Sequence, residues 1–335
     1  MNSDIKILDC TLRDGGYYNN WDFSFELVEE YLEAVALSGI DYVELGFRDF
    51  PKDFYCGPFA YTTERLLDRL SLPSGPQYGV MINASSFIAE SGSIRDNVDK
   101  LFLDKESSKL TLVRVACHFH EVGVGAEIAS ILKIKGYLVG LNLMQAEGRT
   151  SAEIEDCISK ILKCKSVDVL YFADSFGRMR SEEVERIVVE IKKNWSSLIG
   201  IHTHNNMGHA ISNTLCAKKI GVSWHDCTIT GMGRGAGNAE SELLIGEFEN
   251  EANSNALVEF MPSTKFIGCV KECPVINDLI NYLEKLNNND FTSQQAFNGN
   301  INLQLYNYVK NNKIKLVLGE IIGTKINNKS IPLDK

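Results

Sequence analysis

The sequence predicts an α/β protein built as a closed (β/α)8 barrel of the triosephosphate isomerase type, a TIM barrel, with a mostly helical C-terminal extension. Short apolar or β-branched runs recur at intervals of roughly thirty residues, and each is followed by a helical pattern. Eight such units occur before about residue 248. Strands that alternate with helices are typical of a parallel sheet, and eight units favour a sheet that closes on itself.

The predicted strands are nearly continuous in hydrophobicity, as expected for strands that are buried on both faces. They span residues 6–10, 42–46, 78–82, 112–116, 137–143, 169–173, 200–204 and 224–230. Between them, apolar residues in 28–35 keep helical spacing and Gly39 supplies a stop signal. Thr150 and Glu153 have the spacing of a capping box, which predicts the start of another helix.

The rhythm of strands and helices ends near residue 248, which divides the chain into two predicted parts. Residues 1–248 form the barrel, the catalytic domain, and residues 249–335 form a mostly helical extension with asparagine clusters. The extension could cover the barrel mouth, build a dimer interface or pack on the outside.

Composition indicates a globular protein that acts on small molecules. Of the 335 residues, 44% are hydrophobic and 23% charged, and the formal net charge is -10. A surplus of acidic groups argues against binding to nucleic acid. No apolar run reaches membrane-spanning length, and the first residues do not resemble a signal peptide, so we expect a cytoplasmic protein without a membrane partner. Nine cysteines without a C-x-x-C pair predict reduced thiols.

Polar and ionisable residues gather where the predicted strands end, the face on which barrel enzymes place their active sites. In chain order they are Arg13, Asp14, Glu44, Arg48, Asn83, His118, His120, Asn142, Gln145, Asp174, Ser175, His202, His204 and residues 231–238. Loop ends are normally polar, but repetition at one end of the barrel favours an active site.

His202 and His204 predict a metal centre. Side chains two residues apart on a strand point to the same face, so both imidazoles can reach one ion, and Asp14 is the candidate carboxylate ligand. Two imidazoles and one carboxylate suit Mn²⁺, Fe²⁺, Co²⁺ or Zn²⁺ and tolerate Mg²⁺. The structural alternatives are strand histidines with local hydrogen bonds and an aspartate that serves a turn.

Residues 231–238 are too rich in glycine for a strand or a helix interior and predict a tight loop with exposed N–H groups. Such a loop could contact a bound ligand, or could simply lead into the next helix.

His118 and His120 follow the fourth strand, where either could serve as acid or base. Tyr17 and Tyr18 could pack, or carry a proton beside the metal.

Taken together, these motifs resemble the DRE-TIM metallolyases, the family that contains 3-hydroxy-3-methylglutaryl-CoA lyase, isopropylmalate and homocitrate synthases, and 4-hydroxy-2-oxovalerate aldolase. The resemblance covers roughly residues 5–248, and the last branch is the most similar. The resemblance rests on five motifs: Thr11-Leu12-Arg13-Asp14-Gly15, Val43-Glu44-Leu45-Gly46, Ala173-Asp174-Ser175, His202-Thr203-His204-Asn205 and Gly231-Met232-Gly233-x-Gly235-Ala236-Gly237-Asn238-Ala239.

The resemblance implies a divalent-metal aldolase that acts on a pyruvate-like 2-oxo acid and an aldehyde, with Mn²⁺ as the first choice of metal and Mg²⁺, Co²⁺ or Zn²⁺ as alternatives. Asp14, His202 and His204 would ligate the metal, and Asn238 would contribute as in the synthase branch. Arg13 would stabilise an enolate, and Glu44 would hold Arg13. The substrate contacts expected at the same end of the barrel are Ser175, Asn142, Gly233 and Gly235.

Because Arg13 and Asp14 are adjacent, they would point to opposite faces of a strand. The chain must therefore curl at the strand end, which Gly15 and Gly16 allow. Tyr17 stands where the aldolase branch carries a catalytic histidine, so the acid or base role falls to Tyr17, His118, His120 or a metal-bound water.

Three other functions fit parts of the pattern. A Claisen-type acyltransferase would condense acetyl-CoA with a 2-oxo acid, and a non-haem iron oxygenase would use the same ligand set. A non-catalytic barrel could act as a subunit beside a dehydrogenase that consumes an aldehyde. We expect a homodimer in any of these cases.

Overall fold

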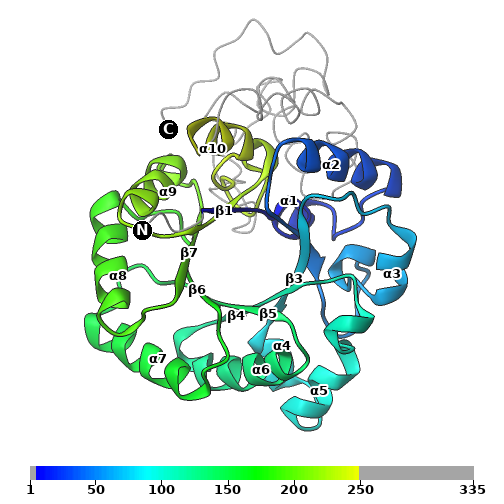
Figure 1. Ribbon diagram of the computed structural model, residues 1–335, viewed down its shortest axis with the longest axis horizontal. Helices are drawn as coiled ribbons and strands as arrows, with labels where there is room; N and C mark the ends of the chain where they lie inside the picture. Colours follow the sequence, from blue (N-terminus) through cyan, green and yellow to red (C-terminus); the bar gives the residue numbers. More distant parts are fainter. Residues whose placement is uncertain (1–4, 249–335) are drawn as a thin grey trace, which may run out of the picture.

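The computed structural model describes residues 5–248, which form a closed barrel of eight parallel strands (Figure 1). Each strand pairs with the next, and β8 pairs with β1 to close the ring. The strands are β1 (Lys6–Asp9), β2 (Tyr42–Phe47), β3 (Gln77–Asn83), β4 (Leu112–Cys117), β5 (Leu138–Leu143), β6 (Val169–Asp174), β7 (Leu198–Thr203) and β8 (Trp224–Cys227). The predicted TIM barrel is therefore confirmed.

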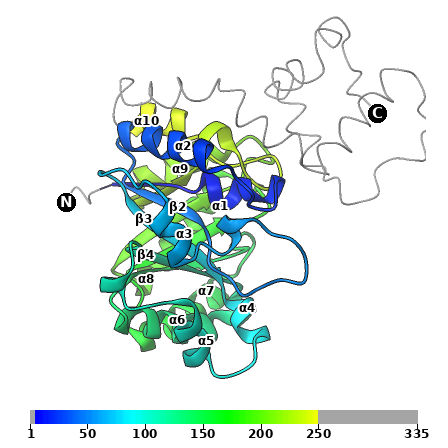
Figure 2. The same cartoon turned by 90° about the vertical axis from the view of Figure 1, so that its right-hand side faces the viewer.

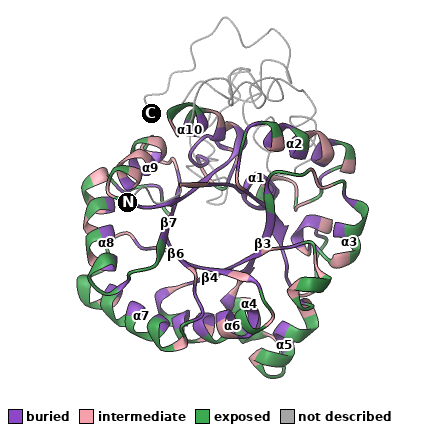
Figure 3. Cartoon of the chain, in the orientation of Figure 1, coloured by how far each residue is buried: buried purple, intermediate pink, exposed green. Residues whose placement is uncertain are grey.

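Helices surround the strands, with buried faces toward the barrel and exposed faces outward (Figure 3). They are α1 (Thr11–Gly15), α2 (Phe25–Leu37), α3 (Glu64–Arg69), α4 (Ala84–Ala89), α5 (Ile94–Leu101), α6 (Val122–Ile134), α7 (Ser151–Cys164), α8 (Ser181–Asn194), α9 (Ala210–Lys219) and α10 (Ser241–Phe248). The predicted capping box of Thr150 and Glu153 begins α7. None of the helices in residues 5–248 is long and apolar enough to cross a membrane.

Strand boundaries differ from the predicted ones by a few residues. The largest difference is in β8, which was expected to reach residue 230 but ends at Cys227. Thr230 has a φ of 56°, so the chain leaves the extended conformation there and forms a 3-10 turn, Ile229–Gly231. The predicted helical extension, 249–335, lies outside the described residues.

Two glycines make room for large side chains inside the barrel. Arg114 on β4 and Tyr171 on β6 are fully buried, and the Arg114 guanidinium lies over the Tyr171 ring at 4.7 Å. A Cβ at Gly140 would lie 3.0 Å from Cγ of Arg114, and a Cβ at Gly200 would overlap the Tyr171 ring. The interior therefore holds a charged arginine where barrels commonly hold branched apolar side chains.

Asp9 connects the first strand to two outer helices through hydrogen bonds. Its carboxylate accepts hydrogen bonds from the Thr11 N–H, the Tyr31 hydroxyl of α2 and the Ser241 hydroxyl of α10. Both helices lie at one side of the barrel (Figures 1 and 2). Because a buried carboxylate needs such partners, this cluster fixes where the chain enters and leaves the barrel.

We predict that Gly200→Ala destabilises the barrel by about 1–3 kcal/mol, because the new methyl group must displace the Tyr171 ring in a closely packed interior. Thermal unfolding followed by circular dichroism measures the effect. Gly123→Ala is the matched control, since a Cβ there meets nothing within 4 Å. Equal melting temperatures for the two variants would contradict the packing argument.

Candidate metal centre and active site

The chain curls directly after β1. Such a curl was expected, because the adjacent Arg13 and Asp14 can reach the same region only if the chain leaves the extended conformation there. Residues Thr11–Gly15 form one short helix, which brings both side chains to the same buried region. Gly15 and Gly16 follow with ordinary helical φ values of -68° and -60°. Their requirement is space rather than flexibility, because a Cβ at Gly15 would meet Sδ of Met232 at 2.6 Å and one at Gly16 would overlap the Trp21 ring.

Asp14, His202 and His204 form one buried group, as predicted. One ligand atom from each side chain lies within 4.8 Å of those of the other two. Nε2 of His202 is 3.6 Å from Oδ2 of Asp14, too far for a good hydrogen bond, and has no hydrogen-bond partner. The three side chains therefore leave a gap between ligand atoms rather than closing on one another.

Asn238 lies against this group at the end of the glycine-rich loop. Its Nδ2 donates to Oδ2 of Asp14 at 2.5 Å, its Oδ1 is buried without a partner, and its backbone forms a bridge with His204. A Cβ at Gly233 would overlap the Asn238 amide, and Gly235 has a φ of 80°. Tyr18 donates to the Gly233 carbonyl. These glycines thus allow the loop to approach the site closely.

The electrostatics suit a cation. Burial alone would raise the pKa of Asp14, but the neighbouring Arg13, His202 and His204 outweigh it and hold that pKa well below its usual value. Burial lowers the pKa of His204 to about 3. Asp14 is therefore ionised and His204 neutral near pH 7. Burial lowers the pKa of His202, but its contacts with Asp14 and Asp226 outweigh burial and raise that pKa, so a metal would compete with a proton for this ring.

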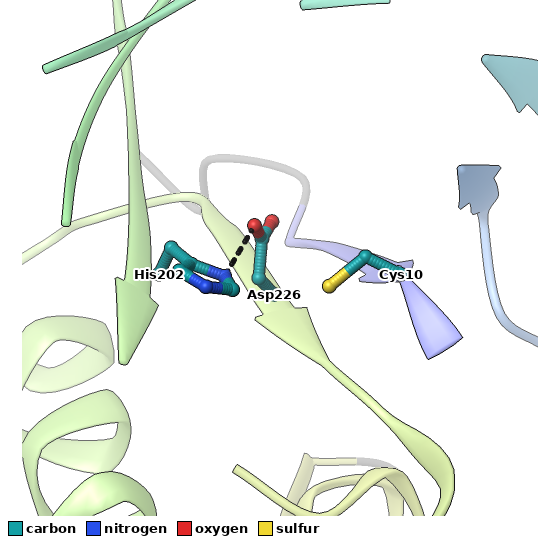
Figure 4. A group of neighbouring side chains, drawn as sticks. All are labelled: Cys10, His202 and Asp226. Carbon is teal, nitrogen blue, oxygen red and sulfur yellow. Dashed lines mark hydrogen bonds and ion pairs between the residues drawn. The ribbon is translucent and has the colours of Figure 1, made fainter. Parts of the chain in front are cut away.

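The residues present fit a divalent metal. They offer two imidazoles, a carboxylate and an amide oxygen, and the buried Nε2 of His202 and Oδ1 of Asn238 lack partners within residues 5–248. Nδ1 of His202 is 3.0 Å from Oδ2 of Asp226, so an outer carboxylate orients the ring (Figure 4). Mn²⁺, Co²⁺, Zn²⁺ and Mg²⁺ remain open on these grounds.

Glu44 holds Arg13, as expected. Nε of Arg13 donates to Oε2 of Glu44 at 2.7 Å, and Nη1 donates to Oδ1 of Asp14 at 2.8 Å. Nη2 is buried and unpartnered among the described residues. The guanidinium therefore keeps one donor available beside the metal ligands.

Sequence reasoning missed two charged residues, Arg114 and Asp226. Arg114 lies between Glu44 and Asp226 and bonds both. Cys10 joins His202 and Asp226 in a second close group, with its thiol pointing toward Asp226 (Figure 4). Because Asp226 already accepts from Arg114 and His202, we interpret this group as support for His202. The sequence signal that could have revealed Arg114 is an arginine within the otherwise apolar fourth strand.

The other predicted residues have varied surroundings. His118 caps the 3-10 turn Phe119–Glu121, and the His120 side chain is 79% exposed and stacked on His118. Ser175 accepts a hydrogen bond from the Gln145 N–H, and the buried Oδ1 of Asn142 has no partner within residues 5–248. Their catalytic and substrate roles stay predictions.

Tyr17 lies on α1's continuation, three residues after Asp14. Its ring packs edge-on against Trp21 and Phe47, with centroids 4.8 and 6.2 Å away, yet remains 42% exposed. Burial and the Asp14 charge raise its pKa. The phenol therefore keeps its proton near pH 7, which suits an acid better than a base.

Fold and site together define a TIM barrel with a buried group of residues that could hold a metal ion. Residues 108–260 match the family model described as HMGL-like. A 4-hydroxy-2-oxovalerate aldolase of Carboxydothermus hydrogenoformans is 30% identical over 248 residues, which are 73% of this chain and 70% of the relative. An oxaloacetate decarboxylase of Mycobacterium tuberculosis is 26% identical over 254 residues, 75% and 72% of the two chains.

Solved structures agree. The N-terminal domain of a putative aldolase from Bacteroides vulgatus is 30% identical with a TM-score of 0.69, over 83% of this chain and 96% of that one. HMG-CoA lyase from Bacillus subtilis, at 14% identity and a TM-score of 0.65 over 83% and 98%, shares the fold. The chain belongs to the HMGL-like family and is a lyase of that family.

We predict that Asp14→Asn and His202→Ala each lower the amount of bound divalent metal at least about tenfold, because each removes one of the grouped candidate ligands. Equilibrium dialysis followed by elemental analysis measures the metal content. His120→Ala is the matched control, since the exposed His120 is not among the grouped ligands. Full metal content in both ligand variants would show that the centre lies elsewhere.

Proposed function

We propose that the protein is an aldolase that makes or breaks a carbon–carbon bond next to a 2-oxo acid, through a pyruvate-like enolate. The carrying observation is the unpartnered Nη2 of Arg13 beside the group of Asp14, His202 and His204. A cationic donor next to a metal centre suits an oxygen that gains negative charge during reaction.

Asp14, His202, His204 and Asn238 would hold the ion, and Mn²⁺ is the proposed metal because the donor set mixes imidazole nitrogen with oxygen. Such an ion supplies a Lewis acid for the carboxylate and ketone oxygens of a 2-oxo acid. Asp226 keeps the His202 ring oriented through its Nδ1.

Arg13 would stabilise the enolate oxygen. Its Nε and Nη1 are already engaged by Glu44 and Asp14, so the guanidinium is held in place before substrate arrives. Preorganised donors of this kind stabilise developing charge without the cost of reorientation. Asn142 and Ser175 are proposed to contact the substrate at the same end of the barrel.

The second fragment of the substrate is proposed to be an aldehyde. Cleavage of a 4-hydroxy-2-oxo acid transfers the hydroxyl proton to a base and releases an aldehyde together with the pyruvate enolate. In the reverse direction an acid must protonate the new alkoxide. Tyr17, which retains its proton, is proposed as that acid.

Decarboxylation of a 3-carboxy-2-oxo acid such as oxaloacetate is a second candidate. Loss of CO₂ gives the same enolate without removal of a proton, and the enolate then needs only an acid. The similarity to the Mycobacterium tuberculosis oxaloacetate decarboxylase favours this reaction, and Tyr17 would supply the acid in it as in the aldol reaction.

A cytoplasmic location, a homodimer and a dehydrogenase partner complete the proposal. All seven cysteines within residues 5–248 are free thiols, which suits a reducing compartment. A dehydrogenase that oxidises aldehydes would consume the released fragment. Residues 249–335 are proposed as a separate C-terminal extension of the catalytic barrel.

We predict that the protein exchanges the methyl protons of pyruvate with deuterium in a manner that needs both Mn²⁺ and Arg13. Proton NMR of pyruvate in D₂O, with chelated enzyme, with Mn²⁺ restored and with Arg13→Ala, measures the rate. Removal of one preorganised donor should cost about 100-fold or more. Exchange that persists in Arg13→Ala would remove the enolate role of this residue.

We predict that Tyr17→Phe lowers turnover at least about 100-fold while metal content is unchanged, because the variant loses only the acid. Assays with oxaloacetate and with 4-hydroxy-2-oxo acids identify which reaction Tyr17 serves. Tyr55→Phe, which alters an exposed hydroxyl bonded to Asp22, is the matched control. Undiminished turnover of every substrate would transfer the acid role to another group.

A further inference from the structure

Six ionisable side chains inside the barrel form a nearly closed ring. Starting at Asp14, each residue contacts the next, and the ring returns from His202 to Asp14. In order they are Asp14, Arg13, Glu44, Arg114, Asp226 and His202. The opening, 3.6 Å between Nε2 of His202 and Oδ2 of Asp14, lies between two of the proposed metal ligands.

Arg114 makes the central contacts of this ring. Its Nε and Nη2 donate to the two oxygens of Glu44, both at 2.8 Å, and its Nη1 donates to Oδ2 of Asp226 at 2.6 Å. Glu44 then holds Arg13, and Asp226 holds His202. Each of the three guanidinium nitrogens of Arg114 thus donates to a group that supports one half of the site.

The contacts match the planar fork of a guanidinium. Two parallel bonds to one carboxylate fix both partners in orientation, which a lysine ammonium cannot do. Gly140 and Tyr171 confine the stem and the face of the Arg114 side chain. The position is therefore shaped for arginine in a single arrangement.

We propose that Arg114 is a positioning residue that fixes the positions of the proposed metal ligands and of the enolate-stabilising Arg13 relative to each other. It reaches neither group directly and acts through Asp226 and Glu44. The effect on catalysis rests on the proposed function, whereas the effect on metal binding does not.

The test measures two quantities on the full chain, the Mn²⁺ dissociation constant by competition with a chelator and the kcat for pyruvate exchange at saturating Mn²⁺. Arg114→Lys should raise the dissociation constant about tenfold or more and lower kcat by a similar factor. Asp226→Asn should act mainly on Mn²⁺ binding, and Glu44→Gln mainly on kcat.

Arg48→Lys is the matched control. Arg48 is equally buried and bonds Thr62 and Glu64, which are not members of the ring, so its substitution can cost stability but should leave both quantities within about twofold. In Arg114→Ala, added guanidinium should restore Mn²⁺ affinity, while added methylammonium should not.

Two outcomes would overturn the proposal. One is an unchanged Mn²⁺ affinity in Arg114→Lys. The other is a loss of Mn²⁺ affinity and kcat in Arg114→Lys no greater than the loss in Arg48→Lys, when both variants lower the melting temperature equally. If no variant at position 114 folds, Glu44→Gln and Asp226→Asn still decide. In the double variant their effects on Mn²⁺ affinity and on kcat, taken together, should be non-additive when Arg114 bridges them, and additivity in both quantities would refute the coupling. Weakened Mn²⁺ binding without any exchange activity in the native chain would instead reject the proposed function alone.

Discussion

The structure depends on the pairing of buried charges inside the barrel. Arg13, Arg114, Asp14, Glu44 and Asp226 are all buried, and an isolated ion in such a place costs several kcal/mol. Two cations against three carboxylates leave one excess negative charge when the histidines are neutral. Burial lowers the pKa of His202, but its contacts with Asp14 and Asp226 outweigh burial and raise that pKa, so a proton on His202, or a cation bound in its place, can balance that charge.

This constraint explains choices elsewhere in the chain. Glycine at positions 140 and 200 gives the charged interior the space that branched side chains would fill. The short helix after β1 places Arg13 and Asp14 together rather than on opposite faces. The site is thus rigid because its supports are the barrel's own packing, and rigid supports are what electrostatic catalysis needs.

Much of this could be predicted from the sequence, for physical reasons that also set the limit. Strand periodicity found the eight strands, and His202 with His204 could be placed on one face by spacing alone. Arg114 and Asp226 escaped because a strand buried on both faces is recognised by its apolar residues, and their partners lie far away in the sequence. The predicted β8 ran on to residue 230 because β-branched residues continue there, whereas the strand ends at Cys227 and a 3-10 turn follows in which Thr230 has a positive φ.

The glycines after Asp14 show a further limit. The adjacency of Arg13 and Asp14 predicted the curl, and the glycines were expected to allow it. Glycine is needed there because Met232 and Trp21 come close, which only the folded chain brings about. The site also divides the proposed function into two parts. In the proposed reaction the buried ring would support the half that forms an enolate, whereas the departing fragment would lie toward Tyr17, whose side chain is partly exposed. Relatives named as an aldolase and as a decarboxylase differ in that departing fragment, so the position that distinguishes them should be sought at the mouth rather than among the metal ligands.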